Sequence, residues 1–361
     1  MSTMRRYSRE VKVGGVIIGG ASPISVQSMT NTDTKDIDAT YSQVMRLDEA
    51  GCDVVRITAP DIESVKTFEA LKARGVKIPL VADIHFNHEI AIAAAKSGAD
   101  KIRINPGNIG SDEKVKRVVE TCLECRVPIR IGVNSGSLEK NILSKYGAPT
   151  GEALAESALY HASLLEKFGF YNTVISVKAS GVTEMLEANR ILAARTDYPL
   201  HLGVTEAGFG NRAIVKSSIG IGALLSEGIG DTVRVSLTSD PVEEIGAARE
   251  ILGALGLSRV GMDIVSCPTC GRTRINLIEI CQRFEALVKA EGLDKLNIKV
   301  ALMGCAVNGP GEAREADVGI AGGDGCGLIF RKGEILRKVK EDELLSELIK
   351  EIKEIRDENA L

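Results

Sequence analysis

The chain has 361 residues, of which 44% are hydrophobic and 26% charged, and its formal net charge at pH 7 is −4. This balance is typical of a globular protein with two domains, or with one barrel and an appendage, and it gives no reason to expect nucleic acid as a partner. The apolar runs are short and broken by glycine, and the first ten residues contain no apolar segment, so we expect a cytoplasmic protein without a membrane span.

The predicted elements begin with a hairpin and continue as a repeated strand–helix unit. Apolar and polar residues alternate over residues 9–18 around Gly14 and Gly15, which is a two-residue turn signal. Apolar runs predict strands at Ile24–Met29, Val54–Ile57, Leu80–Ile84, Ile102–Ile104, Ile129–Val133, Thr173–Val177, Leu200–Val204 and Val233–Leu237. Amphipathic patterns predict helices at Thr40–Ala50, Ile62–Ala73, Glu89–Ser97, Asp112–Cys125, Gly151–Phe168, Val182–Ala194, Arg212–Glu227 and Val242–Leu255. Eight units of similar size favour a closed (β/α)₈ TIM barrel over an open doubly wound sheet.

The pattern changes after Leu257. Strands are predicted at Gly261–Val265, Leu296–Met303, Asp317–Ile320 and Gly327–Phe330, and helices at Arg274–Ala290 and Glu343–Ile355. We therefore predict two domains, with residues 1–255 forming the barrel and residues 256–361 forming a small α+β domain.

Cations occur in the predicted barrel strands, where apolar residues are the rule. They are Arg56, Arg103, Arg130, Lys178 and Arg234. By strand parity, Asn105 shares a face with Arg103, Asn134 with Arg130, and Ser236 with Arg234. An outward face would leave unpaired charges under the helices, which is unfavourable. We therefore predict that these residues point inward and converge at the carboxyl end of the barrel, where barrel active sites lie.

Two carboxylates accompany these cations. Asp83 ends one predicted strand and Glu206 follows another, which leaves about three surplus positive charges. Such a site needs an anion, and arginine guanidinium groups match phosphate oxygens. A self-neutralised lattice of ion pairs is the alternative. Either carboxylate could transfer protons, or it could simply orient an arginine.

The small domain carries a cysteine pattern typical of a metal site. Cys267 and Cys270 are two residues apart, and Cys305 begins a Gly/Pro-rich loop that ends at Glu312. Three thiolates suit an iron–sulfur cluster or zinc, and no histidine follows His201 to complete a closed zinc site. The pattern favours iron–sulfur. Ordinary buried thiols, or a zinc-stapled barrel that binds a phosphorylated metabolite without redox chemistry, are the alternatives.

Several segments resemble one family closely. They are residues 25–30, 82–86, 101–108, 130–134, 266–273 and 303–312. They are similar to the bacterial 4-hydroxy-3-methylbut-2-enyl diphosphate synthases of the non-mevalonate isoprenoid pathway, in the two-domain form. The resemblance runs from the first hairpin to about residue 330. It implies an iron–sulfur oxidoreductase that opens and dehydrates 2-C-methyl-D-erythritol 2,4-cyclodiphosphate reductively.

The resemblance also implies a set of site residues. A [4Fe–4S] cluster would be held by Cys267, Cys270, Cys305 and Glu312. The substrate would be bound by Arg56, Arg103, Asn105, Arg130, Asn134, Lys178, Arg234, Ser236 and Asn308. Glu206, Glu312 and Asp83 would be catalytic, with Glu206 delivering a proton and Glu312 acting as a ligand that yields to substrate. Flavodoxin or ferredoxin would donate electrons, and the protein would be a homodimer in which one subunit's cluster domain covers the other's barrel mouth.

Overall fold

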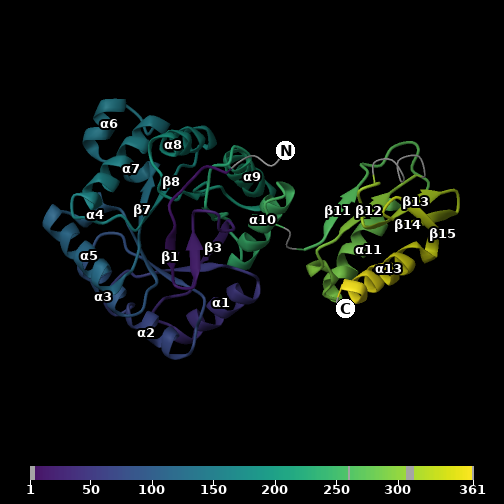
Figure 1. Cartoon of the computed structure of the whole chain (residues 1–361), viewed down its shortest axis with the longest axis horizontal. Coiled ribbons are helices and arrows are strands. Elements are labelled where there is room, and N and C mark those ends of the chain that lie inside the picture. Colours follow the sequence, from purple (N-terminus) through teal and green to yellow (C-terminus); the bar gives the residue numbers. More distant parts are fainter. Residues whose placement is uncertain (1–4, 259–260, 306–312, 360–361) are drawn as a thin grey trace. The chain divides into compact units, whose positions relative to one another are not determined.

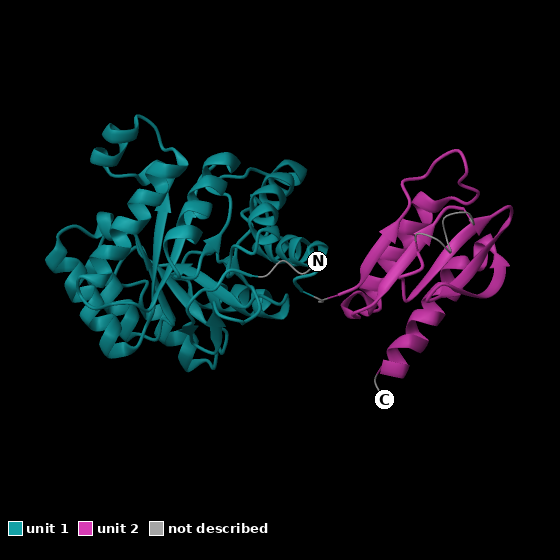
Figure 2. Cartoon of the chain, turned by 45° about the horizontal axis from the view of Figure 1, so that its top comes forward, with its two compact units in different colours: residues 1–258 teal, residues 259–361 magenta. Residues whose placement is uncertain are grey.

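The computed structural model describes residues 5–258, 261–305 and 313–359. The chain divides into two compact units, residues 1–258 and residues 259–361 (Figure 2). Asn308 and Glu312 lie outside the described residues. Each unit is a fold in itself, and each is described separately below.

The first unit is an eight-stranded parallel barrel surrounded by helices (Figure 1). Its strands are β3 (Ser25–Met29), β4 (Val54–Thr58), β5 (Leu80–Asp83), β6 (Lys101–Ile104), β7 (Ile129–Asn134), β8 (Thr173–Lys178), β9 (His201–Leu202) and β10 (Thr232–Val233). The sheet order is β8-β7-β6-β5-β4-β3-β10-β9, and a parallel bridge between Ile175 and Leu200 joins its two ends. The predicted (β/α)₈ barrel is therefore confirmed, with β9 and β10 shorter than their apolar runs.

Helices follow the strands around the barrel. They are α1 (Ile37–Glu49), α2 (Lys66–Ala73), α3 (His88–Lys96), α4 (Pro106–Ile109), α5 (Asp112–Cys125), α6 (Lys140–Tyr146), α7 (Gly151–Glu166), α8 (Val182–Arg195), α9 (Gly210–Ser226) and α10 (Pro241–Ala254). A short 3-10 turn, η1 (Ser135–Ser137), follows β7. In α1 the carboxylate of Asp36 accepts a hydrogen bond from the Ala39 N–H, and Val44 and Leu47 are buried at helical spacing. The sequence pattern did not predict α4 or α6, which are short helices between a strand and the next main helix.

A hairpin closes the amino-terminal end of the barrel. It consists of β1 (Val11–Val13) and β2 (Val16–Ile18), joined through Gly14 at a φ of +54°. Val11, Val13 and Ile18 are fully buried and pack against Val174 at the start of β8. Gly14 lies against residues that immediately precede β5 and β6. The floor of the barrel is therefore apolar.

The second unit is a five-stranded mixed sheet in the order β11-β12-β13-β14-β15, with helices packed on it. The strands are β11 (Asp263–Ser266), β12 (Lys299–Met303), β13 (Val318–Gly323), β14 (Cys326–Arg331) and β15 (Glu334–Lys340). The helices are α11 (Leu277–Ala290) and α13 (Leu344–Asn359), with 3-10 turns η2 (Leu293–Lys295) and η3 (Glu341–Glu343). Phe284 of α11 and Ile352 of α13 are buried in one core with Leu302 of β12. The predicted α+β character is confirmed, although β15 was not predicted because its exposed, charge-rich sequence has no buried face of its own.

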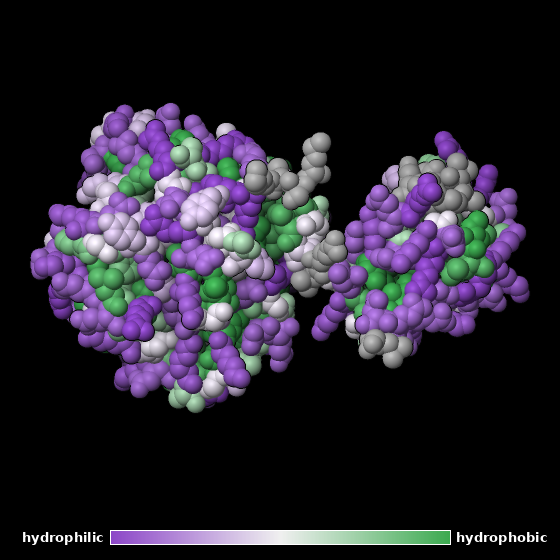
Figure 3. All heavy atoms as spheres, viewed as in Figure 1, coloured by the Kyte–Doolittle hydropathy of each residue, from purple (hydrophilic) through white to green (hydrophobic). Residues whose placement is uncertain are grey.

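The surfaces of the two units are mainly hydrophilic. Figure 3 shows separate hydrophobic patches among hydrophilic residues on the visible face of each unit. In the described part of the chain, no helix combines the length and the apolar character that crossing a bilayer requires.

Candidate active site

Side chains from most of the barrel strands converge on a cavity of about 100 Å³. The lining residues, here called the cationic cup, are Arg56, Asp83, His85, Arg103, Arg130, Asn134, Ser176, Lys178, Thr205, Arg234 and Ser236. Most of them lie in or just beyond the carboxyl-terminal halves of their strands, whereas Arg56 is the middle residue of β4 and Arg130 the second residue of β7. The structure therefore brings together the five predicted cations on the inward face that strand parity indicated.

Two carboxylates contact these cations. Asp83 lies between Arg103, whose Nη1 is 3.2 Å from Oδ1, and Arg56, whose Nε is 3.7 Å from Oδ2. Arg234 is paired instead with Glu244 of α10, through Nη2–Oε1 at 3.1 Å and Nε–Oε2 at 3.2 Å. Glu244 is 3% exposed and also accepts a hydrogen bond from the Ser28 hydroxyl at 2.8 Å. The second counter-charge of the cup is therefore a helix residue that sequence reasoning missed.

Arg130 and Lys178 have no carboxylate partner among the described residues. Arg130 is 1% exposed, and its Nη1 donates to Oε1 of Gln27 at 3.0 Å. Burial, and then repulsion by Arg56 and Arg103, lower the pKa of Arg130 well below its ordinary value. Burial, and then repulsion by Arg234, lower the pKa of Lys178 in the same way. Two carboxylates thus face five cations, of which Arg103, Arg130 and Lys178 are buried and Arg56 and Arg234 partly buried. An oxyanion would neutralise this excess of positive charge.

The carboxylate of Asp83 stabilises the empty cup. Burial opposes its ionisation, but the charges of Arg56 and Arg103 outweigh burial and lower the pKa of Asp83 from 3.8 to about 2. Its contribution to stability is therefore complete above about pH 4 and is lost as the pH falls through about 2. At neutral pH the group is a carboxylate, so it orients Arg56 and Arg103 and has no proton to donate.

We expect Asp83→Asn to lower the free energy of unfolding by about 2 kcal/mol at neutral pH, because Arg56 and Arg103 lose their shared counter-charge. The measurement is urea unfolding of the wild type and the variant from pH 7 to pH 3. The difference between them should be constant down to about pH 4 and shrink below it. A difference that stays constant to pH 3 and beyond would show that Asp83 does not act through its charge.

Two glycines make room for the cations. A Cβ atom on Gly132 of β7 would lie 2.2 Å from Nε of Arg103. A Cβ atom on Gly203 would lie 2.7 Å from Nζ of Lys178 and 2.5 Å from the carbonyl oxygen of Arg234. Neither contact is possible in a folded protein, so any larger residue at these positions would displace a cation from the cup.

We expect Gly132→Ala to weaken the binding of inorganic diphosphate roughly tenfold or more, because Arg103 must leave its position. Isothermal titration calorimetry measures the loss. Gly136→Ala is the matched control, since a Cβ atom there has no neighbour within 4 Å. Equal affinities for the two variants would show that the position of Arg103 does not matter for anion binding.

Two of the site residues predicted in the barrel, Asn105 and Glu206, are not among the residues that line the cup. Asn105 is 2% exposed, and its Oδ1 accepts a hydrogen bond from the Gly107 N–H at 3.1 Å, which caps α4. Glu206 is exposed, has a φ of +51°, and follows Thr205, which does line the cavity. Asn308 and Glu312 lie outside the described residues.

The cup also contains polar residues that sequence reasoning did not assign to it. Ser176, Thr205 and His85 line the cavity. Ser176 lies two residues before Lys178 on β8, so strand parity could have identified it. Glu244 has no such signal, because its contact with Arg234 depends on how α10 packs.

The three cysteines predicted to hold a metal follow the carboxyl ends of two neighbouring strands of the second unit. Ser266 of β11 pairs in register with Leu302 of β12, so Cys267 and Cys305 follow adjacent parallel strands. The Gly304 N–H donates to Sγ of Cys267 at 3.3 Å, a bond that stabilises thiolate sulfur. Cys267 is partly exposed, Cys270 exposed and Cys305 buried, and none forms a disulfide.

These thiols suit a metal in their chemistry, but their positions do not by themselves make a site. Among the described residues no group of three or more His, Cys, Asp or Glu side chains could hold a metal ion. The free thiols and the N–H donor to Cys267 fit an iron–sulfur cluster. The predicted fourth ligand, Glu312, is outside the described part of the chain.

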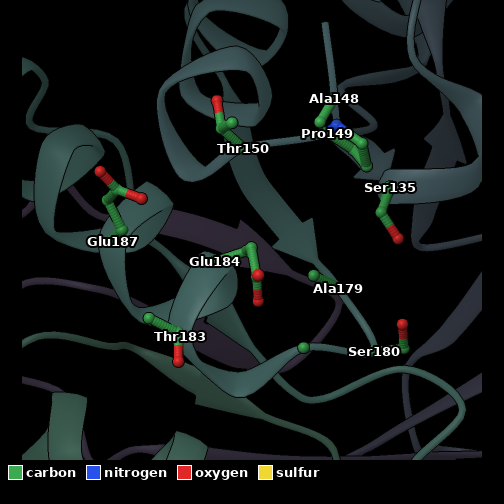
Figure 4. Close-up of a pocket in the computed structure, with 10 residues that line it drawn as sticks. Ser135, Ala148, Pro149, Thr150, Ala179, Ser180, Thr183, Glu184 and Glu187 are labelled. Atoms are coloured by element: carbon green, nitrogen blue, oxygen red, sulfur yellow. The ribbon is translucent and has the colours of Figure 1, made fainter. Parts of the chain in front are cut away.

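A larger hollow of about 430 Å³ lies where β7 and β8 end (Figure 4). Ser135 follows β7, Ala179 follows β8, and the carboxylates of Glu184 and Glu187 belong to α8. Its lining residues are hydroxyl-bearing, apolar or acidic, and none of them is a cation. An oxyanion would therefore bind in the cationic cup and not in this hollow.

Comparison with known proteins relates both units to one family. The model of the GcpE TIM-barrel domain matches residues 8–249, and the model of the GcpE protein C-terminal domain matches residues 263–354. A Clostridium perfringens protein is 57% identical over 351 residues, which cover 97% of this chain and 99% of that protein. A Clostridium tetani protein is 56% identical, with the same coverage. Both are named 4-hydroxy-3-methylbut-2-en-1-yl diphosphate synthase (flavodoxin).

Solved structures support the barrel fold alone. A dihydropteroate synthase from Stenotrophomonas maltophilia with active site-bound imidazole matches with a TM-score of 0.50 and 16% identity. The match covers 68% of this chain and 98% of that one. With both domain models matched in order along its length and relatives that are more than half identical, the chain belongs to the GcpE family.

Proposed function

We propose that this chain is an iron–sulfur oxidoreductase of the non-mevalonate isoprenoid pathway. It converts 2-C-methyl-D-erythritol 2,4-cyclodiphosphate into 4-hydroxy-3-methylbut-2-enyl diphosphate by reductive ring opening and dehydration. The observation that carries the proposal is the cationic cup, in which five buried or partly buried cations meet two carboxylates. Relatives named as this synthase cover nearly the whole chain and support the same reaction.

The cup fits a diphosphate in charge and in geometry. Its surplus of about three positive charges matches a diphosphate group, and arginine guanidinium groups donate two parallel hydrogen bonds to phosphate oxygens. Opening the ring breaks a carbon–oxygen bond and leaves negative charge on the freed phosphate oxygen. Arg130 and Lys178 have no carboxylate partner among the described residues, so they are the cations best able to stabilise that charge.

Loss of the hydroxyl group as water requires a proton. Asp83 is held as a carboxylate by its arginine neighbours, so its proposed role is to orient Arg56 and Arg103. Glu206 stays the proposed proton donor, since its neighbour Thr205 lines the cavity and Glu206 itself is not paired with an arginine among the described residues. Asn134 and Ser236 supply neutral polar groups for the substrate's hydroxyl and phosphate oxygens. Asn105 and Asn308 are further proposed substrate contacts.

Cys267, Cys270 and Cys305 would hold a [4Fe–4S] cluster, with Glu312 as the fourth ligand. A carboxylate is a harder, more weakly held ligand than thiolate, which suits a position that must open to substrate. When bound, the cluster supplies the two electrons one at a time, and the relatives' names point to flavodoxin as their source. A cytoplasmic homodimer, in which one subunit's cluster domain covers the partner's barrel mouth, completes the proposal.

The decisive experiment measures product formation from the cyclic diphosphate. The protein is purified and reconstituted with iron and sulfide without oxygen, and it is supplied with a chemical reductant. We expect a brown protein that forms 4-hydroxy-3-methylbut-2-enyl diphosphate. A colourless protein that contains zinc and binds the substrate unchanged would favour the zinc-stapled alternative. An iron-loaded protein without turnover would refute the proposed reaction.

A further inference from the structure

A second polar layer lies inside the barrel, between the cationic cup and the apolar floor. Its members are Ser25, Gln27, Lys101 and His201, and Arg130, which also lines the cup, joins the layer to it. Each is at most 3% exposed. Each also has a side-chain atom without a hydrogen-bond partner among the described residues: Ser25 Oγ, Gln27 Nε2, Lys101 Nζ, Arg130 Nε and His201 Nε2. Buried polar atoms are nearly always paired, so five unpaired ones in one layer require an explanation.

Strand parity directs these side chains into the barrel. Lys101 lies two residues before Arg103 on β6, and Arg103 lines the cup. Gln27 on β3 reaches Arg130 across the interior. His201 on β9 lies two residues before Gly203, against which the Lys178 side chain rests. The layer is therefore the continuation of the cup toward the floor.

Lys101 is the member whose charge is least compensated. It is fully buried, and among the described residues no ion pair or hydrogen bond reaches its ammonium group. The charged groups that act on it electrostatically are Arg130 and Arg56, both cations of the cup. Burial, and then these two arginines, lower the pKa of Lys101 well below its ordinary value. The apolar floor formed by Val11, Val13 and Ile18 offers no counter-charge from below.

A buried lysine without a counter-charge does not stabilise the fold. An uncompensated charge in a barrel interior is unfavourable, and an apolar side chain of similar volume is commonly neutral or stabilising in its place. Its neighbour at the same level, Val81 of β5, is apolar and fully buried. No described residue supplies a stabilising partner for Lys101. The cup lies at the carboxyl side of the same strand, where Arg103 lines it, so a ligand in the cup is the candidate partner.

We propose that Lys101 is a positioning residue of the diphosphate site. Its positive charge attracts a bound diphosphate from below Arg130, without direct contact. The inference rests on the proposed function, because a bound diphosphate is the counter-charge that the layer lacks. In a low-dielectric interior a full charge acts over several ångströms, so contact is not needed. The contribution of Lys101 to binding affinity must then increase with the negative charge of the ligand.

The experiment compares the dissociation constants of inorganic diphosphate and inorganic phosphate by calorimetry at fixed ionic strength, with the full-length protein. We expect Lys101→Met to weaken diphosphate about tenfold and phosphate by a clearly smaller factor, because phosphate carries less charge. The thermal midpoint of the free variant should equal or exceed that of the wild type. Lys101→Gln, which keeps a hydrogen-bonding group but removes the charge, should show the same ratio if the methionine variant does not fold.

Val81→Ala is the matched control. It perturbs packing at the same level of the barrel without changing charge, so it should lower the thermal midpoint and leave both affinities unchanged. Equal losses for the two ligands, or no loss, in the Lys101 variants would overturn the inference and leave the diphosphate site in place. If the wild type itself does not bind diphosphate, the proposed function falls, and this inference falls with it.

Discussion

Replacing Arg130 by methionine should weaken the binding of the cyclic diphosphate by about a hundredfold or more. Arg130 is buried beside the cavity, and among the described residues it donates only to the side-chain amide of Gln27, so its guanidinium is available to phosphate oxygens. Loss of a charge-assisted, bidentate contact in a buried site corresponds to about 3 kcal/mol or more. We expect the substrate concentration needed for half-maximal turnover to rise, while iron content stays at the wild-type value.

Two further variants separate the effect of the positive charge of Arg130 on binding from the effect of its planar guanidinium. Arg130→Lys keeps the charge but loses the planar fork, so it should recover only part of the affinity. Arg190→Met removes an arginine whose ion pair with Glu227 lies on the outer surface of the barrel, and it should bind like the wild type. Unchanged affinity in Arg130→Met would remove this residue from the phosphate site, even if the protein is active.

Replacing Cys267 by serine should abolish turnover and reduce iron from about four atoms per chain to less than one. Its Sγ accepts the Gly304 N–H and lies at the end of β11, next to the strand that leads to Cys305. A serine hydroxyl is a poor ligand for iron compared with thiolate. Iron analysis and visible absorbance of anaerobic protein report the loss, and calorimetry should show unchanged binding of inorganic diphosphate, because the cup belongs to the other unit.

Cys125→Ser is the control for this experiment. Cys125 has the same spacing from Cys122 that Cys270 has from Cys267, but it is exposed at the end of α5 on the barrel. It should keep both iron and activity. Full iron content in Cys267→Ser would show that Cys267 does not hold the cluster.

Glu312→Gln should keep much of the iron and lose turnover, in accordance with a ligand that yields to substrate.

The sequence was sufficient to predict the barrel and the inward face of its cations. Both follow from repetition and parity: the strand–helix unit recurs eight times, and Arg130 and Asn134 must share a face of β7. Strand parity also places Lys101, two residues before Arg103, on the inward face of β6. Its proposed role could be inferred only from the structure, which shows that it is buried and has no partner among the described residues.

Other features depend on tertiary contacts that a local pattern does not contain. Glu244 is an ordinary acidic residue near the start of a helix until α10 packs against β3 and brings its carboxylate to Arg234. The edge strand β15 is defined by its pairing with β14 and not by a hydrophobic face. The spacing of the cysteines predicts a metal site, but the proposed fourth ligand, Glu312, lies outside the described residues.

The hairpin of β1 and β2 gives the barrel a single entrance. Because Val11, Val13 and Ile18 seal the far end, a molecule in the cup can arrive and depart only past the carboxyl ends of the strands. For the proposed reaction, the substrate, the isoprenoid product and the released water must use this opening in turn. Product departure through this one opening can then limit the turnover rate.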